Sequence, residues 1–303
     1  MKKITSYTLV AVVALAFVVM ALGPDRMNPI LNTLFGVETP PAVAPIPVPR
    51  ADRVADRVLN HVIEADVEAL INRFANFGSR VPGYDGHTQA AQFIVSEFER
   101  LGLTNVETEL FGVTAPIDKG GVLQRLDTGE TFALHSVWPN LVKTSTVPQT
   151  QGQLIYGGDG TFASFDGHEM EGAIVLMEFN SWNNWINAGM LGAKQVIFIE
   201  PDSTLTAEAE QKFLQVPNSV ERFWIDKASG RKLQAELEAK GSLTVSLEAE
   251  MLWEKHDVPN VLGWIPGTDP VLKEKTIVIS AYYDAMSVVP ALGAAFAAAE
   301  EAA

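Results

Sequence analysis

The chain has 303 residues, of which 47% are hydrophobic and 19% are charged, so its composition is that of a globular protein long enough for two domains. The net charge of −15 is spread along the sequence, and no stripe of Lys and Arg offers a face for phosphates. We therefore expect no nucleic-acid partner. Cysteine is absent, which excludes thiolate catalysis, CxxC redox chemistry and cysteine-based zinc sites.

The N-terminus has the pattern of a secretory signal or a signal anchor, which we assign to residues 1–23. Lys2 and Lys3 precede an apolar run within residues 4–22 that is just long enough to span a membrane. The best small-x-small pattern would place Pro24 directly after the cut, so we expect an uncleaved anchor, with cleavage and secretion as the alternative. The lysines then stay in the cytoplasm, and the rest of the chain lies on the extracytoplasmic (periplasmic) face of the cell membrane.

A linker and two helices are predicted next. The linker, residues 24–52, contains a proline-rich stretch that favours extended geometry and forms a semi-rigid stalk. A helix is predicted from Arg53 to Gly78, with apolar residues three, four and seven apart, and a second helix from His87 to Leu101. The apolar face of the first helix consists of Leu59, Val62, Ile63, Leu70, Phe74 and Phe77.

The character of the chain changes after Gly112, and the change predicts an inserted domain. Helices are expected only at residues 185–191 and 226–240, and from Pro259 the pattern resembles buried parallel strands. We predict an α/β domain, residues 53–112 and 256–303, interrupted by a strand-rich α+β module, residues 113–255. The predicted strands are residues 105–111, 153–156, 173–179, 195–200, 222–225, 243–252, 260–265 and 276–282.

Three ordered segments resemble metallopeptidase family 28, which includes bacterial aminopeptidases and the transferrin-receptor and glutamate-carboxypeptidase proteins. The first is Gly-Ser-Arg-Val-Pro-Gly-Tyr-Asp-Gly at residues 78–86, which resembles the family's opening. The second, residues 152–227, resembles a protease-associated (PA) insert. The third is the strand pair at residues 260–284. The resemblance implies a partial, aminopeptidase-like three-layer α/β sandwich interrupted by the PA domain, with peptides as substrates.

The resemblance also implies two zinc ions, and here the sequence departs from the family. The family enters its metal site with His-x-Asp, where this chain has Tyr282-Tyr283-Asp284. Asp284 matches the aspartate that orients the metal-binding histidine, whereas Tyr282 replaces the histidine itself. Binding zinc through a phenol requires displacing a proton at neutral pH, so we expect Tyr282 to pack or to form hydrogen bonds. Residues 285–303 contain no Asp, Asn or His that could bridge two metals.

We therefore expect a membrane-tethered relative of a zinc aminopeptidase that binds no zinc and has no hydrolase activity as this chain, and that is a fragment of a longer protein. The alternative is a non-catalytic binding or scaffold module, such as the periplasmic part of a permease, with a protein partner. Two minor patterns are interpreted structurally: His256-Asp257 as a linker, and Trp182, Trp185 and Trp224 as packing residues, with a sugar or peptide platform as the alternative.

Overall fold

The computed structural model describes residue 60 and residues 62–292, and it divides into two units, residues 1–64 and 65–303. Almost all of the first unit lies outside the described residues, and so do the predicted signal or anchor and the proline-rich linker. No helix within the described ranges has the length and apolar character to cross a membrane. The fold below is that of the second unit, together with the helix that begins at its boundary.

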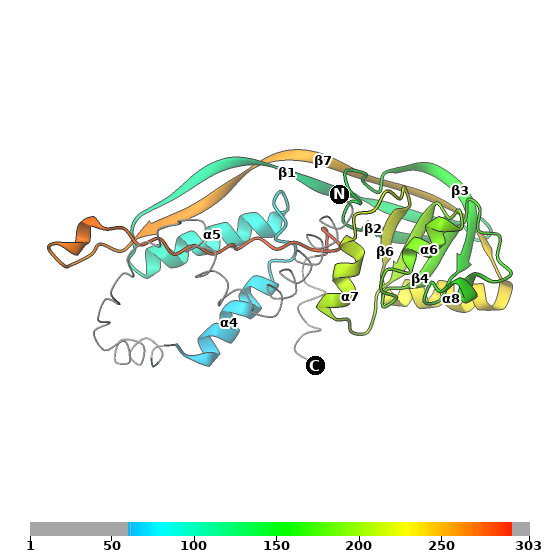
Figure 1. The fold of residues 1–303 in the computed structure, drawn as a ribbon, viewed down its shortest axis with the longest axis horizontal. Helices are drawn as coiled ribbons and strands as arrows, with labels where there is room; N and C mark the ends of the chain where they lie inside the picture. Colours follow the sequence, from blue (N-terminus) through cyan, green and yellow to red (C-terminus); the bar gives the residue numbers. More distant parts are fainter. Residues whose placement is uncertain (1–59, 61, 293–303) are drawn as a thin grey trace, which may run out of the picture. The chain divides into compact units, whose positions relative to one another are not determined.

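Seven strands form a closed, mixed barrel with the order β1-β2-β6-β5-β4-β3-β7 (Figure 1). The neighbours β3-β4, β4-β5 and β5-β6 are parallel, and the other pairs are antiparallel. The strands are β1 (Thr104–Arg125), β2 (Thr131–Ser136), β3 (Val147–Tyr156), β4 (Ile174–Glu178), β5 (Gln195–Ile199), β6 (Glu221–Ile225) and β7 (Leu243–Trp264).

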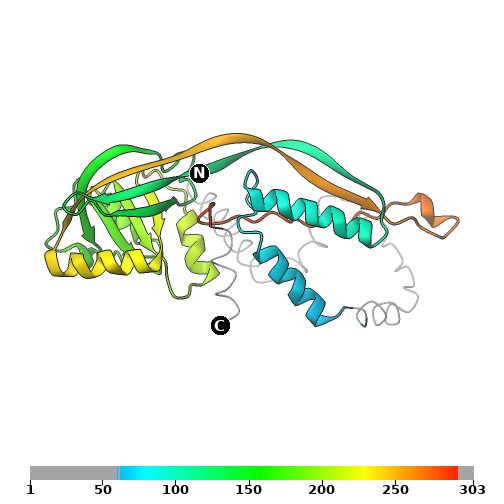
Figure 2. The same ribbon diagram turned by 180° about the vertical axis from the view of Figure 1, so that it is seen from behind.

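The parallel strands form the best-buried part of the core because helices cover them. Every residue of β5 is buried, as its run of Val, Ile and Phe predicts. Helix α8 (Lys227–Lys240) lies against this strand, and a Cβ at Gly230 would come 2.7 Å from Ile199 (Figure 2). Asp226 caps the helix by accepting a hydrogen bond from the Ser229 amide, and Gly241 ends it with a positive φ, as the sequence predicts.

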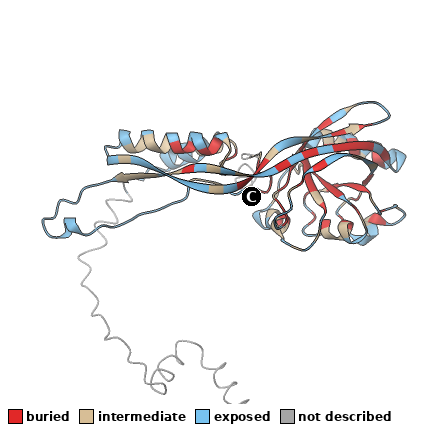
Figure 3. Ribbon diagram, turned by 90° about the horizontal axis from the view of Figure 1, so that it is seen from above, coloured by how far each residue is buried: buried red, intermediate tan, exposed pale blue. Residues whose placement is uncertain are grey.

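Strands β1 and β7 are each 22 residues long and pair antiparallel from Thr104–Trp264 to Arg125–Val245. The halves that belong to the barrel, toward Arg125 in β1 and toward Leu243 in β7, carry buried residues. The other halves of the two strands are mostly exposed (Figure 3). Both strands cross the predicted domain boundaries at residues 112 and 255 without a break. The division of the chain at those two residues therefore stays a prediction.

Two helices and two short elements complete the fold. Helix α5 (Asp85–Arg100) packs on the ribbon of β1 and β7, where Gly263 leaves room for Phe98 and Leu103. Helix α4 (Glu64–Ala75) precedes it and buries none of its residues. The short helices are α6 (Trp185–Met190) and α7 (Thr206–Glu210).

Several predictions about elements are wrong. The predicted helix from Arg53 to Gly78 is not continuous, because residues 62 and 63 are not helical, and α4 runs from Glu64 to Ala75 with its apolar face unburied; residues 53–59 and 61 lie outside the described part. Residues 260–265 belong largely to β7 and pair antiparallel with β1, and His256 lies in the same strand, not in a linker. Residues 276–282 form no strand, because no strand of the described chain lies beside them to accept their hydrogen bonds. Strand β2 was not predicted.

Candidate functional site

The opening motif contacts a segment that lies two hundred residues later in the chain. The Ser79 hydroxyl donates a hydrogen bond to the carbonyl of Pro290, and the Arg80 Nε donates to the carbonyl of Tyr283 at 3.0 Å. In return, the Ala285 amide donates to the Arg80 carbonyl at 3.2 Å. Residues 78–86, the first family-like motif, therefore lie beside residues 283–290, which begin with the last two residues of the third family-like segment.

Tyr84 anchors this opening turn to β1. Its hydroxyl donates to the Pro116 carbonyl at 3.1 Å and accepts from the Asp118 amide at 2.8 Å. Burial raises the pKa of Tyr84 to about 12, so the phenol keeps its proton at neutral pH. Gly83 has a φ of +95°, and a Cβ there would lie 2.8 Å from the His256 ring. The glycine thus allows both the turn geometry and the close approach to β7.

His87 follows the turn and packs under the later segment. Its imidazole is buried, and its ring centroid lies 4.9 Å from that of Tyr283. Burial lowers the pKa of His87 below its ordinary value, and the carboxylate of Asp284 opposes this shift. The imidazole is therefore neutral at pH 7. Arg80 has the same two influences, since burial lowers its pKa and Asp284 raises it.

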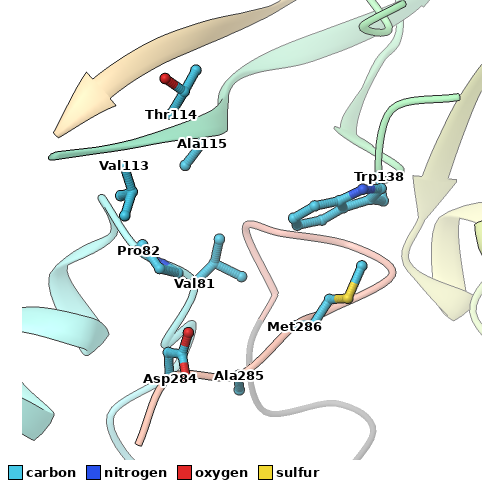
Figure 4. A pocket seen from close by; sticks show the side chains of 9 residues that line it. All are labelled: Val81, Pro82, Val113, Thr114, Ala115, Trp138, Asp284, Ala285 and Met286. Atoms are coloured by element: carbon cyan, nitrogen blue, oxygen red, sulfur yellow. The ribbon is translucent and has the colours of Figure 1, made fainter. Parts of the chain in front are cut away.

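A small open pocket of about 240 Å³ lies between these segments, β1 and Trp138 (Figure 4). Most of its wall is apolar, and the carboxylate of Asp284 is its one charged group. In Figure 4 the Trp138 ring and the Met286 side chain stand opposite Pro82 and Val113. The remaining lining residues are Val81, Thr114, Ala115 and Ala285.

The Trp138 side of the pocket is attached to the apolar cluster that contains β4 and β5 residues. The Trp138 amide donates to the Val288 carbonyl at 2.7 Å, and Val288 and Val289 are buried in this cluster. The chain after Asp284 is thus held at both ends, by the opening turn and by this cluster.

The described residues around Asp284 do not fit a two-zinc site. Zinc in proteins is held by imidazole, thiolate and carboxylate groups, and a metal pair needs a carboxylate shared between the ions. The ionisable groups that interact with Asp284 are instead the Arg80 cation, His87 and the phenol of Tyr283. No group of three or more His, Asp or Glu residues in the described part is placed to hold a metal.

Tyr282 does not pack as expected, since its side chain is 88% exposed. The role assigned to Asp284 by resemblance stays a prediction. The sequence singled out Asp284 but not the residues that surround it. His87 appeared only as the first residue of the second predicted helix, and nothing in the sequence marked Trp138 or Met286 as neighbours of Asp284. The one feature of the sequence that could have pointed to these neighbours is the number of turn-forming residues in the opening motif, which indicates a tightly packed turn.

No family model matches the sequence, and no curated protein matches it. Solved structures do. The zinc aminopeptidase from Bacillus subtilis is 18% identical with a TM-score of 0.45, and the match covers 64% of this chain and 45% of that one. The aminopeptidase from Aneurinibacillus sp. strain AM-1 is 22% identical with a TM-score of 0.38 and the same coverage. A peptidase M28 precursor from Shewanella amazonensis is 12% identical with a TM-score of 0.46, covering 69% and 52%. The chain spans about half the length of these proteins.

Proposed function

We propose that the chain carries the opening of an aminopeptidase-like α/β domain of the family 28 type together with its protease-associated insert, and that it binds peptides without hydrolysing them. The observation that carries this proposal is the contact between residues 78–86 and 283–290. The opening motif and the end of the third family-like segment are separated by about two hundred residues of sequence. The hydrogen bond from Arg80 to the Tyr283 carbonyl joins them directly, which supports the proposal that both belong to one domain.

The proposed lack of hydrolysis follows from the groups around Asp284. A family 28 reaction needs two metal ions to activate water and to stabilise the oxygens of the transition state. Tyr282 offers a phenol where the family has an imidazole, and Asp284 interacts electrostatically with the Arg80 cation. We propose that zinc, although implied by the family, is not bound by this chain.

Peptide binding is proposed from the pocket itself. Its apolar walls suit an apolar side chain, and the Asp284 carboxylate suits a positively charged amine. A peptide with a free N-terminus and a first residue of moderate size has both groups. A membrane tether through residues 4–22 would hold the pocket on the extracytoplasmic side, where it could meet exported peptides.

Hydrolysis is tested with the purified chain and leucine 4-nitroanilide, with added zinc and with a chelator. We expect no cleavage above the uncatalysed rate under either condition. Cleavage that the chelator abolishes and zinc restores would overturn the proposal.

Binding is tested separately, with a fluorescent peptide that begins with leucine and with its N-acetylated counterpart. We expect the free amine to bind several-fold more tightly, and the Asp284→Asn variant to lose this preference. Asp257→Asn, which removes an exposed carboxylate on β7, is the matched control and keeps it. Equal binding of both peptides to the unaltered chain would contradict the assignment of Asp284.

A non-catalytic scaffold, for example the periplasmic part of a permease, is the second candidate. Tyr282 is exposed, and so are the apolar residues Ile277, Val278 and Ile279 before it. Such an apolar surface suits a protein partner and therefore favours the scaffold function. The scaffold function would be favoured if the chain bound neither peptide in the assay above but bound a membrane protein of its own cell.

A further inference from the structure

The parallel part of the barrel brings three loops to one edge. Strands β3, β4 and β5 are parallel neighbours, so the loops after their carboxyl ends, residues 157–165, 179–184 and 200–205, lie next to one another. Hydrogen bonds join them: the Asn184 side chain donates to the Asp159 carbonyl, and the Asn180 side chain to the Ser203 carbonyl, both at 2.9 Å. In α/β sheets, this edge is where ligands commonly bind.

Trp182, in the middle loop, has a strained backbone and an outward side chain. Its φ is +48°, which a bulky residue rarely adopts, and its side chain is 53% exposed. Trp185 and Trp224 are buried, as the sequence predicted for packing residues, but Trp182 is not. Backbone strain of this kind persists only when the surroundings impose it, and it concentrates at functional positions.

A buried ion pair imposes this conformation. The Glu208 carboxylate accepts hydrogen bonds from the amides of Ser181 and Trp182, and the Lys212 ammonium donates to the Trp182 carbonyl. Lys212 is fully buried and lies 2.9 Å from Glu208. A buried pair of charges seldom adds stability compared with apolar residues, because both ions lose their hydration. Its structural effect here is to hold the Trp182 backbone so that the ring faces solvent.

The neighbouring loops add apolar groups beside the tryptophan. Phe162 is 54% exposed and Leu205 is 61% exposed. The side-chain amides of Asn180, Asn184 and Asn187 are already bonded to loop carbonyls, the last at 3.0 Å to Gly160. These three amides hold the loops together, and the exposed Phe162, Trp182 and Leu205 suit the large apolar side chains of a polypeptide.

The charges of these loops select the partner further. Residues 157–169, 179–184 and 200–210 contain no Lys or Arg. Two of their carboxylates are paired with lysines from outside the three stretches, Glu208 with Lys212 and Asp202 with Lys227. An acidic rim attracts cationic segments and repels anionic membranes. The acidic residues are Asp159, Asp166, Glu169, Glu200, Asp202, Glu208 and Glu210.

We propose that the surface formed by Phe162, Trp182 and Leu205, the Trp182 surface, docks a basic polypeptide segment that carries large apolar side chains. Trp182 is the anchor, since aromatic residues held in place contribute most to such contacts. The acidic rim orients the segment and speeds its association. The Glu208–Lys212 pair positions the anchor without touching the partner.

The test uses the full chain and three labelled peptides of equal length, followed by fluorescence anisotropy at low salt and at 150 mM salt. The first peptide contains Lys and Phe, the second has Glu in place of Lys, and the third has Ala in place of Phe. We expect only the first to bind, and salt to weaken its binding. Trp182→Asn removes the ring and accepts a positive φ, so it should fold and lose at least ten-fold in affinity.

Two controls separate this surface from the rest of the chain. Trp264→Ala removes another half-exposed tryptophan, on β7, and should leave the affinity unchanged. Asp284→Asn should also leave it unchanged, which distinguishes this surface from the pocket proposed above. If Trp182→Asn is unstable, Phe162→Ser gives a second reading of the same surface. Unaltered affinity in both surface variants would overturn the proposal. So would equal binding of the Glu peptide, or tighter binding of a neutral oligosaccharide or of anionic vesicles through Trp182.

Discussion

Gly86 offers the sharpest test of how the opening turn is built, through the substitution Gly86→Ala. A Cβ at this position would lie 2.3 Å from the carbonyl oxygens of Phe77 and Ser79 and 2.9 Å from the Ser79 carbonyl carbon. All three obstacles are backbone atoms, so the turn must move by roughly 1 Å to restore ordinary contact distances of about 3.5 Å.

The expected loss in the free energy of unfolding follows from this displacement. Overpacking costs typically about 1–3 kcal/mol, and the upper end applies because no side chain can rotate away. The higher helix propensity of alanine returns at most about 1 kcal/mol, since Gly86 lies in the first turn of α5. If the turn also loses the hydrogen bonds of Ser79 and Arg80 to residues 283–290, each adds about 1 kcal/mol. The free energy of unfolding should therefore fall by about 2–4 kcal/mol.

The measurement is urea unfolding, with Gly112→Ala as the matched control. A Cβ at Gly112 meets only the end of the Lys255 side chain, which can move aside. The control should stay within about 0.5 kcal/mol of the unaltered chain. Amide exchange at Ala285 gives a local measurement, because its N–H is bonded to Arg80 and should exchange faster in Gly86→Ala. Equal stabilities for the two variants would refute the role of Gly86.

Two further predictions concern buried polar groups. Tyr84→Phe leaves the Asp118 amide and the Pro116 carbonyl without their partner, so the free energy of unfolding in urea should fall by about 1–3 kcal/mol. Tyr282→Phe, at an exposed position, is the control and should change it very little. Similar losses in both variants would contradict the anchoring role of Tyr84. Burial lowers the pKa of Lys212 to about 8, below its usual value near 10.5. Between these pH values the unfolded chain binds more protons than the folded chain, so this group makes the unfolding free energy rise with pH, by up to about 3 kcal/mol. The rise should be missing in Lys212→Met, and an identical pH profile in both proteins would refute it.

The sequence predicts strands β4, β5 and β6 and helix α8 better than the other elements because local rules are sufficient there. Strands β4, β5 and β6 are short apolar runs between turn residues, and α8 carries both of its caps, Asp226 and Gly241. Alternation and capping act over a few residues, so they can be identified without knowing what packs where. Strand β2 was missed because its alternation is short and contains a histidine and a serine.

The outer halves of β1 and β7 show where local rules fail. Residues 260–264 have the apolar run of a buried parallel strand, yet they pair antiparallel with β1 on a largely exposed ribbon. Residues 276–282 have the same composition and form no strand. Apolar composition reports that a segment can be buried in a sheet, but a strand exists only where another strand accepts its hydrogen bonds. That partner is a long-range property, which one segment of sequence does not contain.

The site follows the same division between local and long-range information. Resemblance selected Asp284 and the opening motif separately, and each is a weak signal alone. The structure joins them through Ser79, Arg80 and His87, none of which has a periodic or spaced pattern that would mark it. Arg80 is the informative residue, because one side chain bonds both the Tyr283 carbonyl and the Phe74 carbonyl at the end of α4. A guanidinium can bridge two carbonyls in this way, whereas a lysine ammonium lacks the fixed geometry. The arginine of the opening motif is therefore explained by its position between two segments, which it joins through its guanidinium.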